Sequence, residues 1–598
     1  MIMKTFASQM NESKSGDKTM ELTAIYHRPE SEYAYLYKDQ TMHIRIRTKK
    51  DDIESINLHY GDPFIFIEDR YEVIKEMTKV TSDAIFDYWQ VEVTVGYARL
   101  QYLFELKDKQ GRRILYGDKG CVENTLENLH YEGNGFKLPY IHEIDACHVP
   151  DWVSRTVWYQ IFPERFANGN PALSPEGALA WDSSIKPKTS DFFGGDLQGI
   201  IDHLDYLQDL GITGLYLCPI FESPSNHKYN TTDYFEIDRH FGDKETFRKL
   251  VDEAHQRGMK IILDAVFNHI GDQSPQWQDV LKHGEDSVYK DWFHIQDFPV
   301  VKENLVNKRE LSYHTFAFES YMPKLNTANP QVRDYLLSVA TYWIEEFDID
   351  AWRLDVANEV DHQFWRDFRK AVLAKKPDLY ILGEVWHTSQ PWLNGDEFHA
   401  VMNYPLSDSI KDYFLRGVKK TSQFIDEING QSMYYRQQIS EVMFNLLDSH
   451  DTERILATAK GDSQLVKSAL VFLFLQRGTS CIYYGTELEL DGGPDPDCRR
   501  AMPWERVSES NEMLNFMKKL IQLRKSVSDI IQHGTYSLQE IKPDVVSLEW
   551  NHDGQNLRAI FNQSTETYLV DRNSVALASH CQELEQQLVI LPKGFVVF

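Results

Sequence analysis

The sequence predicts an α/β protein built on a closed (β/α)8 barrel of the TIM type, preceded by a β-sandwich and followed by an all-β domain. Residues 21–140 alternate between apolar and polar with a period of two and carry almost no helical pattern. From about residue 155, eight apolar strands alternate with amphipathic helices, and alternation with a period of two returns after about 530. Eight strands separated by helices favour a closed barrel of parallel strands over an open sheet.

The first part of the chain predicts a short tail and a sandwich. Residues 1–19 are polar and lack the uninterrupted apolar segment of a secretory signal, so we interpret them as a tail. Residues 20–148 hold regularly spaced alternating segments, such as HIRIRT at 43–48, YWQVEVTV at 88–95 and LQYLFEL at 100–106. Short strands at regular spacing are typical of two packed antiparallel sheets, that is, of an N-terminal β-sandwich.

The barrel is expected at 149–269 and 328–525. Helical stretches lie between its strands, for example at 244–258, 330–347 and 463–478. The eight candidate strands are VWYQIF (157–162), ITGLYLCP (212–219), IILDAVF (261–267), IDAWRLDV (349–356), YILGEVW (380–386), HAVMNY (399–404), MFNLLDSH (443–450) and TSCIYYG (479–485).

Two further segments complete the predicted organisation. Residues 270–327, after the third strand, are polar and aromatic without a clear helix–strand unit. Because a connection of this length is usually functional, we interpret it as an inserted subdomain. Residues 526–598 contain alternating segments such as VVSLEW and LRAIFN, which predict a C-terminal β-sandwich.

Composition restricts the partners of the protein. The formal net charge of −28 argues against nucleic acid and against an anionic membrane, since both attract clustered Lys and Arg. No apolar run reaches the length of a transmembrane helix. The six cysteines have no C-x-x-C spacing, as expected of free thiols in a reducing cytoplasm. We therefore expect a cytoplasmic protein that binds neither nucleic acid nor a membrane.

Polar side chains follow four of the expected strands at the point where each strand ends. These segments are DAVFNH (264–269), WRLDVANE (352–359), GEVWH (383–387) and LLDSHD (446–451). The carboxyl ends of barrel strands meet at one mouth, so these side chains should gather there. A single carboxylate could simply cap a helix, but several in succession repel one another unless function holds them together. Carboxylates without cysteine or a tight histidine cluster fit glycosidic chemistry better than zinc hydrolysis.

Two carboxylates are the candidates for that chemistry. A retaining glycoside hydrolase needs a nucleophile and a general acid/base about 5–5.5 Å apart, which neighbouring strands supply. Arg353 precedes Asp355 by two residues, so both side chains face the same side of the strand, and the guanidinium favours the ionised form that a nucleophile needs. Glu384 stands beside an apolar Val-Trp pair, which favours the protonated form that a general acid needs.

The four strand-end segments resemble the four signature regions of the α-amylase family, glycoside hydrolase family 13, in that family's order and on the expected strands. MPKLN (322–326) is similar to an extra signature of the branch that contains neopullulanase, cyclomaltodextrinase and maltogenic amylase. WYQIFPERFANG (158–169), SNHKYN (225–230), DPDCRRAMPW (495–504) and residues 24–50 fit that branch too. The resemblance extends from about residue 21 to the C-terminus.

The resemblance implies roles for individual residues. The catalytic residues are Asp355 as nucleophile, Glu384 as general acid/base and Asp451, which binds the 2- and 3-hydroxyls of the −1 sugar. The substrate-binding residues are His269, Arg353, His450, Tyr229, Asp495, Arg499, Trp386 and Phe316. Tyr229 stacks beneath the −1 ring, because an aromatic face suits the apolar face of glucose. Asp495 and Arg499 match the −2 subsite. Trp386 and Phe316 line the acceptor side or, as the alternative, pack in the core.

The sequence departs from the family pattern in two places. Asn230 stands where relatives often have Asp, a change expected to affect local bonding rather than catalysis. Some relatives bind Ca2+ near the first strand, and the corresponding metal residues here are Asn168, Asn170, Gly194 and Asp196. Leu173 and Ser174 stand where relatives offer ligands, and Ca2+ favours several anionic oxygens. We therefore expect that no cofactor is required and that the calcium site is weakened or absent.

The resemblance implies retaining hydrolysis of α-1,4-glucosidic bonds in cyclodextrins, short maltodextrins and pullulan, giving maltose, glucose or panose, with some transglycosylation. Two alternatives remain: a glucan-transferring enzyme with the same intermediate, and a non-catalytic glucan-binding relative, which would typically lack one of the three acids. The N-terminal sandwich resembles a starch-binding module that covers the partner's active site in a homodimer. Tyr33, Tyr35 and Tyr37 could contribute to that contact, although packing on the strand faces explains them equally well.

Overall fold

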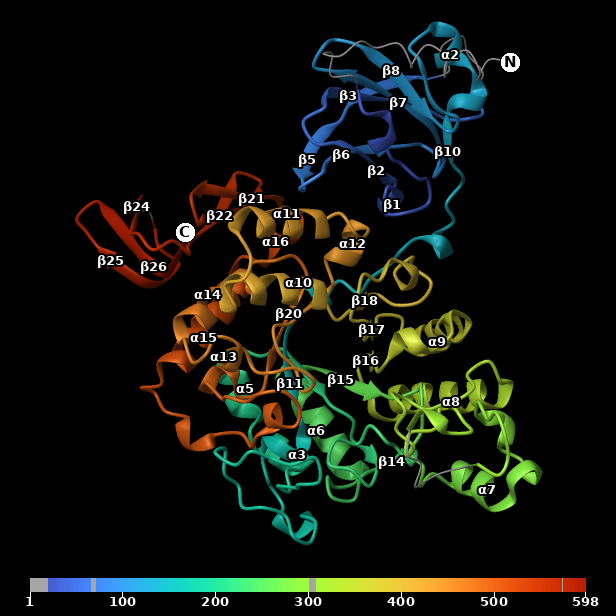
Figure 1. Cartoon of the computed structure of the whole chain (residues 1–598), viewed down its shortest axis with the longest axis vertical. Helices are drawn as coiled ribbons and strands as arrows, with labels where there is room; N and C mark the ends of the chain where they lie inside the picture. Colours follow the sequence, from blue (N-terminus) through green and yellow to red (C-terminus); the bar gives the residue numbers. More distant parts are fainter. Residues whose placement is uncertain (1–19, 66–70, 301–307, 573) are drawn as a thin grey trace. The chain divides into compact units, whose positions relative to one another are not determined.

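The computed structural model describes residues 20–65, 71–300, 308–572 and 574–598, so the tail expected at 1–19 lies outside the described residues. The chain divides into two compact units, Met1–Ala146 and Cys147–Phe598 (Figure 1), and each unit is described by itself below. Among the helices of the described residues, none is both long and apolar enough to cross a membrane.

The first unit is a sandwich of two antiparallel sheets, as the alternating pattern predicts. One sheet has the order β1-β2-β6-β5 and the other β4-β3-β7-β8-β9, with β10 on β7. Their inward faces meet in one core, to which Ile44 and Ile46 of the first sheet and Leu58 and Phe104 of the second contribute. The bounds are β1 Ala34–Lys38, β2 Thr41–Lys49, β3 Ile53–Gly61, β4 Val73–Glu76, β5 Thr78–Ser82, β6 Phe86–Thr94, β7 Leu100–Asp108, β8 Arg113–Gly117, β9 Gly120–Glu123 and β10 Phe136–Leu138.

The second unit contains a parallel sheet of eight strands that closes on itself. The order along the sheet is β18-β17-β16-β15-β12-β11-β20-β19. A parallel bridge between Met402 and Phe444 joins the two ends of this order, so the sheet is a barrel and the fold prediction is confirmed. The bounds are β11 Val157–Ile161, β12 Gly214–Leu217, β15 Lys260–Ala265, β16 Ala351–Leu354, β17 Tyr380–Gly383, β18 Ala400–Val401, β19 Phe444–Asn445 and β20 Thr479–Tyr483.

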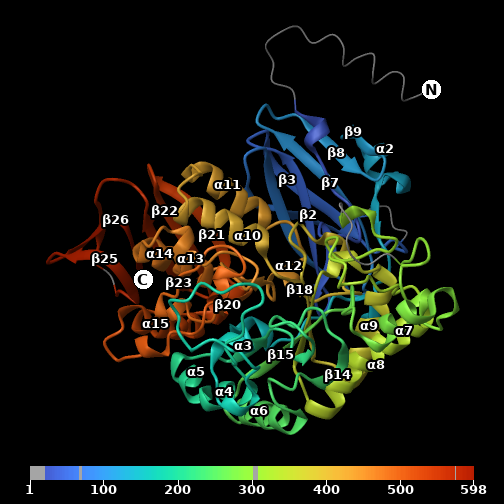
Figure 2. The same cartoon turned by 60° about the horizontal axis from the view of Figure 1, so that its bottom comes forward.

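Helices follow the strands and surround the barrel (Figure 2). Helix α8 has the bounds that the sequence predicts, because Asn329 caps its N-terminus, Pro330 occupies the first turn and Asp348 ends it in a left-handed conformation. The principal helices are α4 Leu197–Asp202, α5 Leu204–Leu210, α6 Lys244–Gln256, α8 Pro330–Phe347, α9 His362–Lys375, α10 Tyr404–Ile410, α11 Thr421–Gln431, α14 Ser463–Phe474 and α15 Glu512–Ser526.

Two excursions from the barrel carry site residues. A hairpin of β13 (Phe221–Glu222) and β14 (Asp233–Ile237) follows the second strand and presents the loop with Tyr229. The insertion after the third strand contains helix α7 (Pro275–His283), which the sequence pattern did not predict although Ser274 caps it and Pro275 opens it. Isolated bridges, among them one between His269 and Lys324, tie the insertion to the end of the third strand.

After helix α16 (Ser528–His533), the C-terminal segment is all-β, as predicted. Its strands form one six-stranded antiparallel sheet of order β21-β22-β23-β26-β24, with β25 also paired to β26. One face joins the core of the barrel unit through Trp550 and Phe595, and the other buries Val545 and Ile560 against the sheet's own last strands. The bounds are β21 Thr535–Lys542, β22 Val545–His552, β23 Gln555–Asn562, β24 Tyr568–Asp571, β25 Leu577–Glu583 and β26 Gln587–Val597.

Candidate active site

Arg353 is the centre of the candidate site. It is the last residue but one of strand β16, and its Nη1 atom lies 2.6 Å from Asp355 Oδ1 and 3.0 Å from each carboxylate oxygen of Asp264. Its Nη2 atom lies 2.9 Å from Glu384 Oε1 in an ion pair that lacks hydrogen-bond geometry. All four side chains are buried. One guanidinium therefore draws the ends of three neighbouring strands, β15, β16 and β17, to a single point.

This cluster holds three carboxyl groups against one positive charge. Burial, and after it the charge of Glu384, raises the pKa of Asp355 well above its usual range, while Arg353 opposes both effects. Burial likewise raises the pKa of Asp264 to about 6. Because charges this close in a dry site cannot all be present, the cluster takes up protons more readily than separate carboxylates would.

The surroundings of Glu384 differ from the sequence expectation. Its Oε2 atom accepts the backbone N–H of Val356 at 2.9 Å, and its Oε1 atom accepts the indole N–H of Trp386 at 3.0 Å. The expectation of an apolar wall was wrong, because Trp386 turns its one polar atom to the carboxylate. Val356, which donates the other hydrogen bond, adopts a left-handed conformation with φ of 46°. Glu384 is thus held in place by two N–H donors, one from the backbone and one from the indole.

Two buried histidines and a tyrosine lie next to the carboxylates. His450 Nε2 lies 2.5 Å from Tyr229 Oη, and Tyr229 Oη lies 2.9 Å from Asp264 Oδ2. His269 Nε2 lies 3.1 Å from the carbonyl oxygen of Tyr229. Burial lowers the pKa of His269 to about 3 and that of His450 well below its usual value, so both rings are neutral donor–acceptor groups.

Asp451 is connected to the predicted −2 pair. Arg499 bridges the two acids, with Nη1 3.0 Å from Asp495 Oδ1 and Nη2 3.4 Å from Asp451 Oδ1. Its Nε atom donates to the carbonyl oxygen of His450 at 2.7 Å. The structure therefore brings Asp495 and Arg499 together with the end of the seventh strand, although they lie after the eighth strand in sequence.

The two aromatic residues predicted for the acceptor side are placed differently. Trp386 is 48% exposed and stacks on Tyr404, with ring centroids 4.0 Å apart and planes at 6°. Phe316 stacks on His269 at 5.1 Å and 16°. Trp386 is therefore no core residue. Sequence reasoning missed Tyr404, which lies just after the sixth strand in HAVMNY and could have been found by the same strand-end rule.

The four predicted calcium residues form a polar loop rather than a cation cage. Both oxygens of Asp196 are occupied by backbone N–H groups of Gly169, Asn170 and Gly199 at 2.6–3.1 Å. Asn168 bonds Ser174, and the N–H of Gly194 goes to Glu164 Oε1. Asn168 Oδ1 is the one buried oxygen here without a hydrogen-bond partner in the described part of the chain. One orphaned amide oxygen and one carboxylate that already accepts three backbone N–H groups are few ligands beside the six to eight oxygens that Ca2+ takes.

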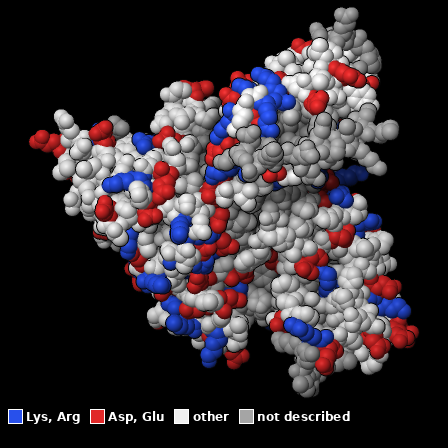
Figure 3. All heavy atoms as spheres, turned by 45° about the horizontal axis from the view of Figure 1, so that its top comes forward, with Lys and Arg blue, Asp and Glu red and all other residues white. Residues whose placement is uncertain are grey.

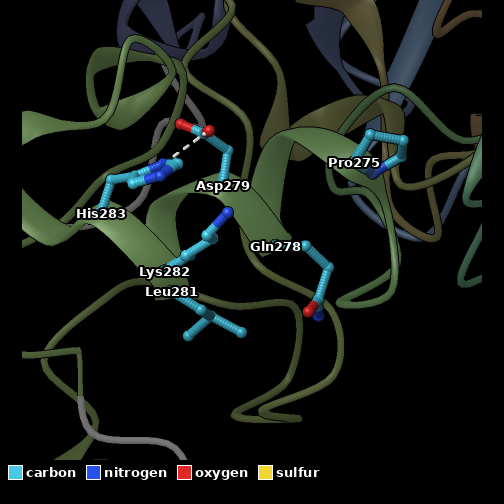
Figure 4. Close-up of a pocket in the computed structure, with 6 residues that line it drawn as sticks. All are labelled: Pro275, Gln278, Asp279, Leu281, Lys282 and His283. Atoms are coloured by element: carbon cyan, nitrogen blue, oxygen red, sulfur yellow. Dashed lines mark hydrogen bonds and ion pairs between the residues drawn. The ribbon is translucent and has the colours of Figure 1, made fainter.

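A hollow of 520 Å³ on helix α7 is lined by Pro275, Gln278, Asp279, Leu281, Lys282 and His283 (Figure 4). Its main interaction is the ion pair of Asp279 and His283 at 2.8 Å. On the face that Figure 3 shows, acidic side chains are intermixed with basic ones.

Buried carboxyl groups around one arginine, flanked by neutral histidines at the mouth of a (β/α)8 barrel, define a glycoside hydrolase. Residues 160–526 match the family described as "Alpha amylase, catalytic domain", and residues 20–142 match "Alpha amylase, N-terminal ig-like domain". The chain belongs to the α-amylase family, which confirms the resemblance seen in the sequence.

Named relatives lie in one branch of that family. The chain is 51% identical to an "Intracellular maltogenic amylase" of Bacillus subtilis, over 93% of this chain and 94% of the relative. It is 44% identical to "Neopullulanase 2" of Thermoactinomyces vulgaris, over 86% of both chains. A solved structure described as "Cyclomaltodextrinase" matches with a TM-score of 0.89 at 42% identity, covering 97% of this chain and 100% of the other.

Proposed function

We propose that the protein hydrolyses α-1,4-glucosidic bonds with retention of configuration. Asp355 attacks the anomeric carbon while Glu384 gives its proton to the leaving oxygen, so the glycosidic C–O bond breaks and a covalent glycosyl ester forms. Glu384 then removes a proton from water, which attacks the same carbon and releases Asp355. The observation that carries this assignment is that the single guanidinium of Arg353 contacts both carboxyl groups, at 2.6 and 2.9 Å, so both face one point.

The proton must lie on Glu384 in the first step, although burial raises the pKa of Asp355. Both carboxyl groups contact the guanidinium of Arg353. Arg353 forms a hydrogen bond with Asp355 but only an ion pair without hydrogen-bond geometry with Glu384. This difference supports Asp355 as the member of the pair that is ionised when substrate is bound.

The surrounding residues are proposed to bind the sugar. Asp451, His269 and His450 bond hydroxyls of the −1 glucose, and Tyr229 supports its ring. The second ring nitrogen of each histidine is engaged by the protein, which fixes the ring for such contacts. The residues proposed for the neighbouring subsites are Asp495 and Arg499 on the donor side and Trp386 and Phe316 on the acceptor side.

The proposed substrates are cyclodextrins, short maltodextrins and pullulan, in keeping with the names of the relatives. Transfer to a sugar acceptor shares the same intermediate and remains the second candidate, because the exposed face of Trp386 offers a stacking surface for an incoming sugar. We also propose a homodimer in which the N-terminal sandwich covers the partner's site. Tyr33 and Tyr35 are buried in their own unit, so Tyr37, which is half-buried, is the tyrosine best placed for that contact.

Product analysis tests this function. β-Cyclodextrin, pullulan and soluble starch are supplied at equal glucose equivalents to the full chain and to a chain that lacks residues 1–148. The full chain is expected to favour cyclodextrin over starch and to give maltose, glucose or panose. Deletion should reduce the ratio of the rate on cyclodextrin to the rate on starch, because a covering domain admits small and cyclic substrates and excludes large ones. An unchanged ratio would count against the covering role, and turnover of none of the three glucans would count against the function.

We further propose that the enzyme needs no bound calcium and acts in the cytoplasm. The first proposal is supported by the three backbone N–H groups that already occupy the carboxylate oxygens of Asp196. Support for the second is the set of six free cysteines and the word "Intracellular" in the name of a relative. Exhaustive treatment with a chelator should leave both the rate on β-cyclodextrin and the melting temperature unchanged. A fall in either that is restored by Ca2+ alone would contradict the first proposal.

A further inference from the structure

The first-strand motif WYQIFPERFANG contains a glutamine, Gln160, that contacts His450 and whose effect on the protonation of that ring is not part of the proposed function. Gln160 lies in β11 with its side chain fully buried, and its Nε2 atom is 2.7 Å from His450 Nδ1. A ring nitrogen can donate or accept, so the contact alone does not say which partner carries the proton. The other side of the ring settles this point.

The Nε2 atom of His450 faces two acceptors. Asp451 Oδ2 lies 3.2 Å from it, and a carboxylate can only accept. Tyr229 Oη lies 2.5 Å from it, and the hydroxyl proton of Tyr229 is directed to Asp264 Oδ2 at 2.9 Å. The hydroxyl oxygen is therefore left to accept. Both neighbours require Nε2 to carry a proton.

The direction of this relay is fixed at its far end. Both oxygens of Asp264 lie 3.0 Å from Nη1 of Arg353, and Tyr216 also donates to the carboxylate at 2.8 Å. A carboxylate held by a guanidinium is an acceptor for every neighbouring hydroxyl. The protons therefore run in one sense, from His450 to Tyr229 and from Tyr229 to Asp264. Because burial keeps the imidazole of His450 neutral, its single proton lies on Nε2 and Nδ1 is bare.

We propose that Gln160 is a positioning residue that fixes His450 as the Nε2–H tautomer, with the amide N–H donated to Nδ1. In this orientation the amide oxygen of Gln160 has no hydrogen-bond partner within the described residues, which a glutamine with a purely structural task would avoid. The inference rests on the proposed function, because the Nε2–H tautomer affects catalysis only if His450 donates toward Asp451 and the −1 sugar. Gln160 acts through His450 and touches no substrate itself.

The tautomer can be measured on the full chain without any turnover. Protein labelled with 15N in histidine gives ring-nitrogen resonances, and those of His450 are identified as the ones that His450→Asn removes. At neutral pH the proposal expects a protonated Nε2 and an unprotonated Nδ1 in the wild type. Gln160→Glu should place a proton on Nδ1, because a carboxylate accepts where the amide donated. A wild-type Nδ1 that carries a proton would overturn the proposal even if the enzyme hydrolyses glucans as expected.

Kinetics separate positioning from packing. Gln160→Glu keeps the shape of the side chain but reverses its role at Nδ1, and it should lower kcat/KM at least about tenfold, since a wrong tautomer can cost up to about 10⁴-fold. Gln160→Met removes the donor without imposing the other tautomer and should have the smaller effect. Because a buried carboxylate is unfavourable in itself, the effect of Gln160→Glu is compared with that of the same change at another buried glutamine.

A double-mutant cycle and a matched control complete the test. In a His450→Asn background, Gln160→Glu should cause little further loss of kcat/KM, because the ring that it acts on is gone. Gln476→Glu, at a buried glutamine that bonds Phe472 in the helix before the eighth strand, measures the general effect of burying a carboxylate. A loss from Gln160→Glu that is as large without His450 as with it, or no larger than that of Gln476→Glu, would overturn the proposal.

Discussion

Replacing Asp355 by asparagine is expected to lower kcat/KM for α-1,4-glucans by about 10⁴-fold or more, because no carboxylate remains to form the glycosyl ester. Binding of a short maltodextrin, measured by calorimetry, should persist, since Asn keeps the size of the side chain.

The same substitution should not destabilise the fold. Burial raises the pKa of Asp355, so its ionised form disfavours the folded state as pH rises, and the neutral Asn variant should unfold at an equal or higher temperature near pH 8. Turnover within tenfold of the wild type would refute the assignment.

Azide distinguishes the two carboxylates. With an aryl α-maltoside, whose leaving group needs no protonation, Asp355→Gly plus azide should give a β-glycosyl azide, because azide attacks from the vacated nucleophile side. Glu384→Ala plus azide should give the α-glycosyl azide, because the ester on Asp355 still forms and is then displaced. Product configuration is read by NMR. Asp367→Asn, on helix α9 with an ion pair to Arg333 at 3.7 Å and a hydrogen bond from Gln363 at 3.2 Å, is the matched acidic control and should behave as the wild type.

Replacing Arg353 by methionine is expected to lower the free energy of unfolding by about 3–5 kcal/mol, because it leaves the carboxyl groups of Asp264, Asp355 and Glu384 buried without their cation. Activity should fall with it, since the variant no longer favours an ionised Asp355. Urea titration measures the first effect and initial rates on β-cyclodextrin the second.

The loss should depend on pH with a definite sign. Without the guanidinium, the pKa values of Asp264 and Asp355 rise further above the unfolded value of about 3.9. The folded state then binds more protons than the unfolded one, so the destabilisation grows as pH rises from about 4 through the raised values. Arg524→Met is the matched control, because this buried arginine donates to the carbonyl oxygens of Phe474 and Gln476 at 3.0 Å and has no acidic partner among the described contacts. The loss of free energy of unfolding caused by Arg524→Met should be nearly constant between about pH 5 and pH 8. An equal pH dependence of the loss in both variants would contradict the charge argument.

The strand-end residues could be predicted because a barrel converts sequence order into spatial convergence. Asp264, Arg353 and Glu384 lie at the carboxyl ends of three consecutive strands or directly after them, and the structure brings both acids to the guanidinium of Arg353. Helix α8 could be predicted equally well, since a cap, a first-turn proline and a left-handed terminal residue all mark its bounds. In both cases local chemistry and long-range packing agree.

Other features depend on contacts that no local pattern encodes. The sequence presents Trp386 as an apolar neighbour of Glu384, but in the structure its indole N–H donates to the carboxylate while its ring stacks on Tyr404 of helix α10. The link from Arg499 to Asp451 joins segments on different strands. Helix α7 was missed for another reason: its signals lie in a polar insertion where a loop was the simpler interpretation.

The pairing of β11 with β20 has a consequence for how the chain is made. Thr156 and Thr479, beside these strands, are hydrogen-bonded across 323 residues. Because the ribosome synthesises the chain from its N-terminus, β11, the first barrel strand, emerges long before β20, the eighth strand with which it pairs. Until then β11 has an unpaired edge, the kind that templates aggregation. The ring can close only when nearly the whole catalytic segment has emerged, so we expect nascent chains that stop before β20 to require a holding chaperone while complete chains do not.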